Sequence, residues 1–149
     1  LDVCLNIADT FLDEGVVVTT EDKNGNVITE KSDANMDDIP MVVLVNENSA
    51  SASEILAGAF KDRGRAKIIG TKTFGKGIVQ KLFPLENGAG AKITISEYKT
   101  PNDEKINKIG VKPDIEVENK NLDLDLNEND FSKDQQFLKA LAELVKEIQ

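Results

Sequence analysis

The forty residues from Met41 to Gln80 constrain the fold more than any other part of this chain. They open with a continuous apolar run, residues 41–45, which is typical of a fully buried strand. Small and polar residues follow, and a helical spacing of apolar residues over 55–63 ends at Gly64. A second apolar run, 66–69, leads into a glycine-punctuated loop. The segment therefore predicts a strand, a serine-rich turn, a helix and a strand, with hydroxyl groups placed where the free N–H groups of a helix can bind an oxyanion.

The rest of the chain predicts two further helices and five further strands. Apolar spacing indicates helices over residues 1–12 and 133–148, the second capped by Ser132. β-prone runs predict strands at residues 16–20, 27–29, 78–85, 91–98 and 110–117. Asn24-Gly25 is expected to form a hairpin turn. Polar connectors are expected at residues 30–38, 100–107 and 118–130.

Composition excludes several classes of function. The chain has no histidine, so by itself it holds no Ser-His-Asp triad, no Cys-His pair and no histidine-ligated metal site. A net charge of −9 argues against a nucleic-acid partner, because phosphate binding needs a basic surface. The single cysteine, Cys4, precludes an intramolecular disulfide, and its apolar context predicts a buried, unreactive thiol.

Three serines, Ser49, Ser51 and Ser53, alternate with alanines before the central helix. They fit two interpretations, as small capping residues of the helix or as a nucleophile mounted at its positive end. The residues themselves do not choose among the three hydroxyl groups.

Lys76 also has two interpretations, an exposed loop lysine or a general base. A lysine that is free in water carries its proton at neutral pH, so the base role requires burial. Phe74 and Ile78 could supply an apolar wall, and Gly75 and Gly77 could let the backbone pass close to the serine.

Several segments of the chain together resemble one known family. These are SASASE at residues 49–54, TFGKG at 73–77, YKTP at 98–101 and IGVKPD at 109–114. Over residues 1–118 the chain is similar to the catalytic core of the carboxyl-terminal processing peptidases, also called tail-specific proteases. Members of this family are serine peptidases with a serine–lysine dyad.

The resemblance implies a role for particular residues. Ser51 would be the nucleophile, Lys76 the general base 25 residues later, and Gln80 the residue that orients the lysine. The backbone N–H of Ala52 would bind the oxyanion. If residues 76–80 are strand, Lys76 and Gln80 share one face. The implied fold is an α/β core of the crotonase and Clp-protease kind, with mixed strands and helices. The implied reaction is cleavage of a polypeptide near its C-terminus, with no cofactor and no metal, outside the cytoplasm or at the membrane-associated cell envelope.

The resemblance also predicts how the chain is organised. Residues 1–118 would be the matching core and 119–149 an acidic loop and a C-terminal helix, so that 1–149 is a partial catalytic domain, truncated on its N-terminal side. The chain contains no PDZ domain, no signal peptide and no glycine-rich segment to supply the family's second oxyanion donor. We therefore expect this fragment alone to be weakly active or inactive, and to need self-association in order to fold.

Other patterns are expected to carry no chemistry. Residues 70–76 fit a phosphate loop, but Gly77 stands where a serine or threonine should follow and a strand replaces the required helix. Residues 96–99 fit the S-x-x-K pattern of penicillin-binding enzymes, again within a strand. Residues 123–129 only partly match a calcium loop. Glu54, Asp62 and Arg63 are expected to form surface pairs on the helix. A non-catalytic interaction module with the same fold is the alternative function.

Overall fold

The computed structural model describes residues 1–86, 88–119 and 131–148. Within them lie three α-helices and seven strands, as predicted. The helices are α1 (Asp2–Phe11), α2 (Ala52–Asp62) and α3 (Gln135–Ile148). The strands are β1 (Gly15–Asp22), β2 (Val27–Ser32), β3 (Val42–Val45), β4 (Lys67–Gly70), β5 (Ile78–Pro84), β6 (Gly90–Lys99) and β7 (Ile115–Glu116).

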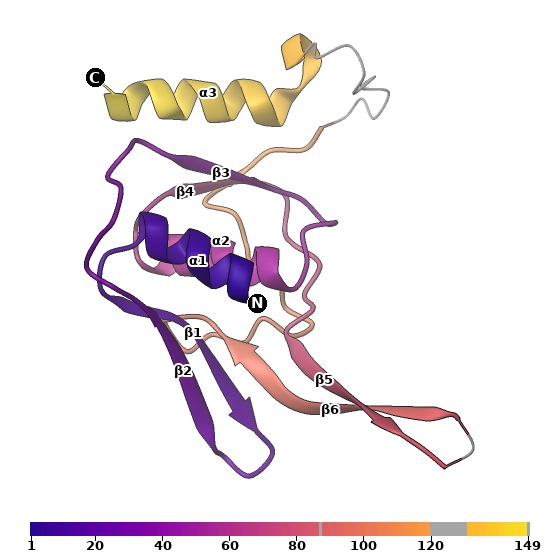
Figure 1. Ribbon diagram of the computed structural model, residues 1–149. Helices are drawn as coiled ribbons and strands as arrows, with labels where there is room; N and C mark the ends of the chain where they lie inside the picture. Colours follow the sequence, from indigo (N-terminus) through magenta and orange to yellow (C-terminus); the bar gives the residue numbers. More distant parts are fainter. Residues whose placement is uncertain (87, 120–130, 149) are drawn as a thin grey trace.

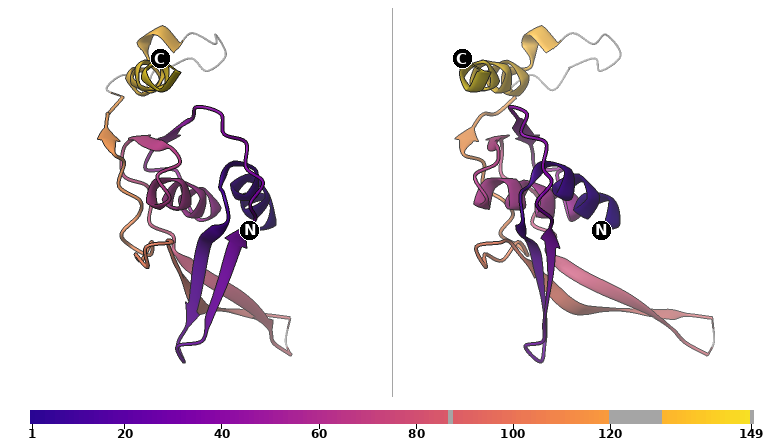
Figure 2. Two further views of the ribbon diagram at one scale, coloured as in Figure 1. Left: turned by 90° about the vertical axis from the view of Figure 1, so that its left-hand side faces the viewer. Right: turned by 60° about the vertical axis from the view of Figure 1, so that its left-hand side comes forward.

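The elements form four layers, which Figures 1 and 2 show from three sides. α3 lies on a parallel three-stranded sheet of order β3-β4-β7. α1 and α2 lie beneath that sheet, and below them is an antiparallel sheet of order β2-β1-β6-β5. The core lies between the sheets and around the two helices, where Ala8, Leu12, Ile68 and Phe60 are at most 3% exposed. Cys4 belongs to this core and is buried, as predicted.

The first strand of the central segment is less buried than its sequence predicts. β3 is an edge strand with two different faces. Val45 turns toward the core and is 5% exposed, whereas Leu44 remains 43% exposed although α3 packs against this strand. A continuous apolar run indicates a strand covered on both faces, and here the cover on one face is incomplete.

The two hairpins of the antiparallel sheet agree largely with expectation. The Asn24-Gly25 turn joins β1 to β2, and Gly25 takes the positive φ of 80° that such turns need. β2 continues to Ser32, which is buried and donates its hydroxyl to the Asp13 carbonyl, so residues 30–32 are strand and not exposed connector. Residues 78–84 and 96–99 are strand, as the arguments against a phosphate loop and an S-x-x-K site required.

The start of α3 differs from the prediction in its capping residue. α3 begins at Gln135, so its N-cap is Asp134, whose Oδ1 accepts the Phe137 N–H at 2.9 Å. Ser132 lies two residues earlier, in a 3₁₀ segment over Phe131–Lys133. The possible calcium loop at 123–129 and most of the predicted acidic connector lie outside the described residues.

Candidate active site

Two loops that follow neighbouring parallel strands form the candidate site. The serine loop, residues 46–51, follows β3, and the lysine loop, residues 71–77, follows β4. Because β3 and β4 pair in parallel, both loops leave the same edge of the sheet, where α/β proteins commonly bind ligands. Backbone hydrogen bonds join them directly. Thr71 N–H donates to the Val45 carbonyl at 3.1 Å, and Phe74 N–H donates to the Ser49 carbonyl at 3.0 Å.

Ser51 differs from the other two serines in its backbone. It sits at the junction of the serine loop and α2 with φ 57° and ψ −116°, a combination that costs energy for a residue with a Cβ. Ser49 accepts a hydrogen bond on its Oγ from the Asn46 N–H at 3.1 Å, which closes the turn. Ser53 lies exposed in the first turn of the helix. A strained strand-to-helix turn is the mount on which serine hydrolases of the α/β-hydrolase fold expose their nucleophile.

Glu54 holds the two loops together, which corrects the expectation of a surface pair. The residue is 0% exposed. One carboxylate oxygen, Oε2, accepts the backbone N–H groups of Ser51 at 3.0 Å and Lys76 at 2.8 Å. The other, Oε1, accepts the Gly75 N–H at 2.6 Å and the Thr73 hydroxyl at 2.5 Å. All four partners are donors, the set that an ionised carboxylate binds.

Thr73 extends this network into the segment 109–114. Its hydroxyl oxygen accepts the Val111 N–H at 2.7 Å while its own hydrogen goes to Glu54. Thr73 N–H in turn donates to the Val111 carbonyl at 3.1 Å. Asp114 fastens the same segment to β4, because its Oδ2 accepts the Ile68 N–H at 2.8 Å. The segment 109–114, one of the motifs that carry the family resemblance, is therefore hydrogen-bonded both to the lysine loop and to β4.

Gly75 and Gly77 allow a close approach of the lysine loop to the backbone of residues 106–110, and not to the serine. Gly75 has φ 89°, and a Cβ there would lie 3.1 Å from the Gly110 N. At Gly77 a Cβ would lie 2.3 Å from the Asn107 N, a distance too short for any residue with a side chain. The lysine loop can follow the backbone of residues 106–110 only with glycine at these positions.

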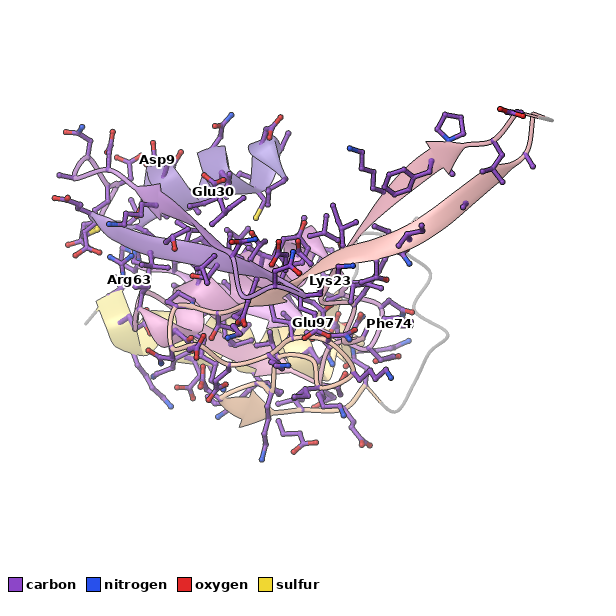
Figure 3. The ribbon with its side chains drawn as sticks, turned by 90° about the horizontal axis from the view of Figure 1, so that it is seen from below. Asp9, Lys23, Glu30, Arg63, Phe74 and Glu97 are labelled. Atoms are coloured by element: carbon purple, nitrogen blue, oxygen red, sulfur yellow. The ribbon has the colours of Figure 1, made fainter. Side chains whose placement is uncertain are left out.

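The Lys76 side chain is exposed in this chain, so the apolar enclosure expected for a general base is not formed here. Phe74, the expected wall, is 68% exposed and lies on the side of the body from which the β5–β6 hairpin projects (Figure 3). Lys76 precedes β5, so strand alternation does not extend to it. The Gln80 amide is exposed and donates to the Thr94 hydroxyl on β6 at 3.5 Å. Roles for Lys76 and Gln80 remain predictions.

Ala52 begins α2, and the first N–H groups of a helix have no acceptor within it. Its carbonyl accepts the Cys4 thiol at 3.3 Å, which fixes α1 against this turn. Burial raises the pKa of the Cys4 thiol, as expected for an unreactive packing residue. Among the described residues, no three acidic or cysteine side chains converge as a metal site would require.

Glu54 and Thr73 are parts of the site that were not predicted from the sequence. A signal for Glu54 was present, because Ser51-x-x-Glu54 is the capping-box pattern, in which the glutamate turns back to the N-cap backbone. No local pattern marks Thr73, since its partners lie 19 and 38 residues away.

Comparisons with known proteins find relatives of this chain in one family. The model of peptidase family S41 matches residues 1–117. A carboxyl-terminal-processing protease of Picosynechococcus sp. is 49% identical over 113 residues, which are 74% of this chain and 27% of the relative. One of the same name from Synechocystis sp. is 47% identical over 117 residues, 76% of this chain and 27% of the relative. The chain thus spans about a quarter of the length of these relatives.

Solved structures agree on the fold. A photosystem II D1 C-terminal processing protease superimposes with a TM-score of 0.74 at 42% identity, over 78% of this chain and 31% of the other. A peptidase-like protein from Parabacteroides merdae superimposes with a TM-score of 0.72 at 19% identity, over 95% of this chain and 46% of the other, and this match shows the fold alone. The expected α/β core of the Clp-protease kind is therefore confirmed.

Proposed function

The chain belongs to peptidase family S41, and on this premise we propose that it carries the serine–lysine dyad of a C-terminal processing peptidase. The observation that carries the proposal is the shared carboxylate. A single buried side chain, Glu54, binds the backbone N–H of both Ser51 and Lys76, so the two proposed catalytic residues are held in one rigid unit. Rigid placement of reacting groups is a large part of enzymatic rate enhancement.

The proposed reaction is hydrolysis of a peptide bond in two steps. In the first, the Ser51 hydroxyl attacks the scissile carbonyl while the Lys76 amine takes its proton, and that proton passes to the leaving amine. In the second, Lys76 accepts a proton from water as the water oxygen attacks the acyl carbon. The bond between that carbon and the Ser51 oxygen then breaks, Lys76 returns the proton to this oxygen, and the acid product leaves. The Ala52 N–H, at the positive end of α2, stabilises the oxyanion in both steps. Gln80 orients the lysine.

Lys76 must lose contact with water to act as a base, and it is exposed in the isolated chain. We propose that the bound polypeptide and parts of the protein beyond this chain exclude water from Lys76. This fits the proposal that the 149-residue chain alone is weakly active or inactive.

The proposed substrate is a polypeptide cut near its C-terminus, which is the activity named for the relatives. The proposed location is outside the cytoplasm or at the cell envelope. One similar relative, from Tetradesmus obliquus, is named as chloroplastic. None of the described helices has the length and apolarity that a membrane span requires.

A peptidase assay on the complete natural protein tests the proposal. The substrate is an unstructured polypeptide, and the variants are Ser51→Ala, Lys76→Ala and, as a matched control from the same turn, Ser53→Ala. We expect cleavage by the natural protein and by Ser53→Ala, none by the other two, and little by the 149-residue chain. If Ser51→Ala still cleaves, or if the complete protein is folded but inert, the dyad is wrong and a non-catalytic interaction module takes its place.

A further inference from the structure

The Thr73 side chain lies outside the proposed dyad and donates a hydrogen bond to the Glu54 carboxylate, which binds the backbone of both dyad residues. We infer that the Thr73 hydroxyl is a positioning residue for catalysis, acting through Glu54 on Ser51 and Lys76. The inference rests on the proposed function. It adds a residue that contacts neither the nucleophile nor the base.

The hydroxyl has a fixed hydrogen-bond direction. Thr73 is 2% exposed, so water does not compete for it. Because the Val111 N–H donates to its oxygen at 2.7 Å, the hydroxyl hydrogen is left for Glu54 Oε1 at 2.5 Å. The result is a directed chain from a backbone amide through a hydroxyl to a carboxylate, with every polar group satisfied.

The Glu54 carboxylate is a rigid plane, so fixing one oxygen fixes the other. Oε1 is held by Thr73 and Gly75, and Oε2 then faces the N–H groups of Ser51 and Lys76. Three of these four contacts are with backbone groups of the two loops themselves. Thr73 supplies the only side-chain donor among these four contacts. Because its oxygen also accepts the Val111 N–H, Thr73 ties the carboxylate to the segment 109–114.

Loss of the hydroxyl would disturb the site more than the fold. Thr73→Val keeps the shape of the side chain, the Thr73–Val111 backbone bond and the Phe74–Ser49 bond between the loops. It leaves the buried Val111 N–H without an acceptor and frees Oε1 on one side. The carboxylate can then turn, and the Ser51 and Lys76 amides move with it.

The same chain offers matched controls. Thr71 lies in the same loop and also donates its hydroxyl to a glutamate, Glu47 at 3.0 Å, but at an exposed position that touches neither Ser51 nor Lys76. Thr71→Val therefore removes a similar bond without the proposed consequence. Thr73→Ser keeps the hydroxyl and loses only the methyl group, so it tests whether the hydroxyl or the side-chain shape matters.

Two measurements on the complete natural protein test the inference. In the first, kcat and KM are measured for Thr73→Val, Thr73→Ser and Thr71→Val. Loss of one hydrogen bond to a charged group corresponds to about a ten- to hundredfold change when it is felt in the transition state. We expect a fall of that size in kcat for Thr73→Val with KM within about twofold, near-complete rescue in Thr73→Ser, and a fall in kcat for Thr71→Val that is at least about fivefold smaller than for Thr73→Val.

The second measurement is amide hydrogen exchange at Ser51, Gly75 and Lys76, which needs no activity. We expect faster exchange at all three in Thr73→Val and not in Thr71→Val. Unchanged exchange overturns the inference, as does a Thr73→Ser variant as impaired as Thr73→Val. If the natural protein does not cleave, or if Ser51→Ala cleaves as well as the natural protein, while exchange responds as expected, the proposed function fails and the link between the loops stands.

Discussion

Glu54→Gln is the substitution for which the structure gives the sharpest expectation. Each carboxylate oxygen of Glu54 receives two donors. Glutamine keeps one oxygen and replaces the other with an NH₂ group, which is itself a donor. Whichever way the amide turns, two bonds made to a buried carboxylate are lost, and at least one backbone N–H is left facing another donor.

The size of the effect follows from the value of each bond. A hydrogen bond to a charged group contributes about 1.5–3 kcal/mol, so two of them amount to about 3–6 kcal/mol of the free energy of unfolding. A domain of this kind is stabilised by only about 5–15 kcal/mol in total. We therefore expect Glu54→Gln to remove a large part of the stability, toward the lower figure if the Thr73 hydroxyl turns to accept from the new amide.

Urea unfolding of the 149-residue chain measures this, with every variant at the same protein concentration because the chain is expected to self-associate. With a slope of about 2 kcal/mol per molar, a loss of 3 kcal/mol lowers the midpoint by about 1.5 M. The matched control is Glu47→Gln, because Glu47 is exposed and accepts a single threonine hydroxyl, and we expect a change below about 0.5 kcal/mol. Equal midpoints for the two variants, with equal slopes, would refute the assignment of Glu54 as the bridge between the loops.

Three further predictions follow from other parts of the structure. Gly77→Ala should cost about 1–3 kcal/mol, because its Cβ would lie 2.3 Å from the Asn107 N, and an unchanged melting temperature would contradict this. Thr100→Val should be neutral or stabilise by up to about 1 kcal/mol in urea unfolding, because the Thr100 hydroxyl oxygen is buried without a partner in the described chain, and a clear loss of stability would contradict this. Lys146, Lys139 and Lys67 lower the pKa of Glu143 from 4.5 to about 2, so the stabilisation it gives to α3 should be full above about pH 4.5 and lost as the pH falls toward 2. A carboxyl ¹³C titration of Glu143 should show a midpoint near 2. A midpoint near 4.5 would contradict the ion pairs that Glu143 forms with the three lysines.

Local chemistry in the sequence determined most of the elements of this fold. The central helix, its stop at Gly64, the Asn24-Gly25 turn and the β5–β6 hairpin each depend on residues close together in the chain, so their patterns could be read directly. The same holds for the amphipathic spacing of the last helix. Some expectations were wrong at the ends of elements, as at residues 30–32, which continue β2. Others were wrong about the surroundings of an element, as with Leu44, which is exposed because a neighbouring helix covers β3 only in part.

For the candidate site, the sequence by itself supplied the residue types and a resemblance, but not their arrangement. The residue types alone left Ser49, Ser51 and Ser53 equivalent, and only the resemblance selected Ser51. Glu54 was expected on the surface, and Thr73 had no role. The tertiary structure separates these residues, because the parallel pairing of β3 and β4 brings two loops to one sheet edge and buries Glu54 between them. Burial removes water as a competing partner, so a carboxylate that the sequence places on a helix surface has to bind the backbone of both loops, and that requirement comes from contacts distant in the chain.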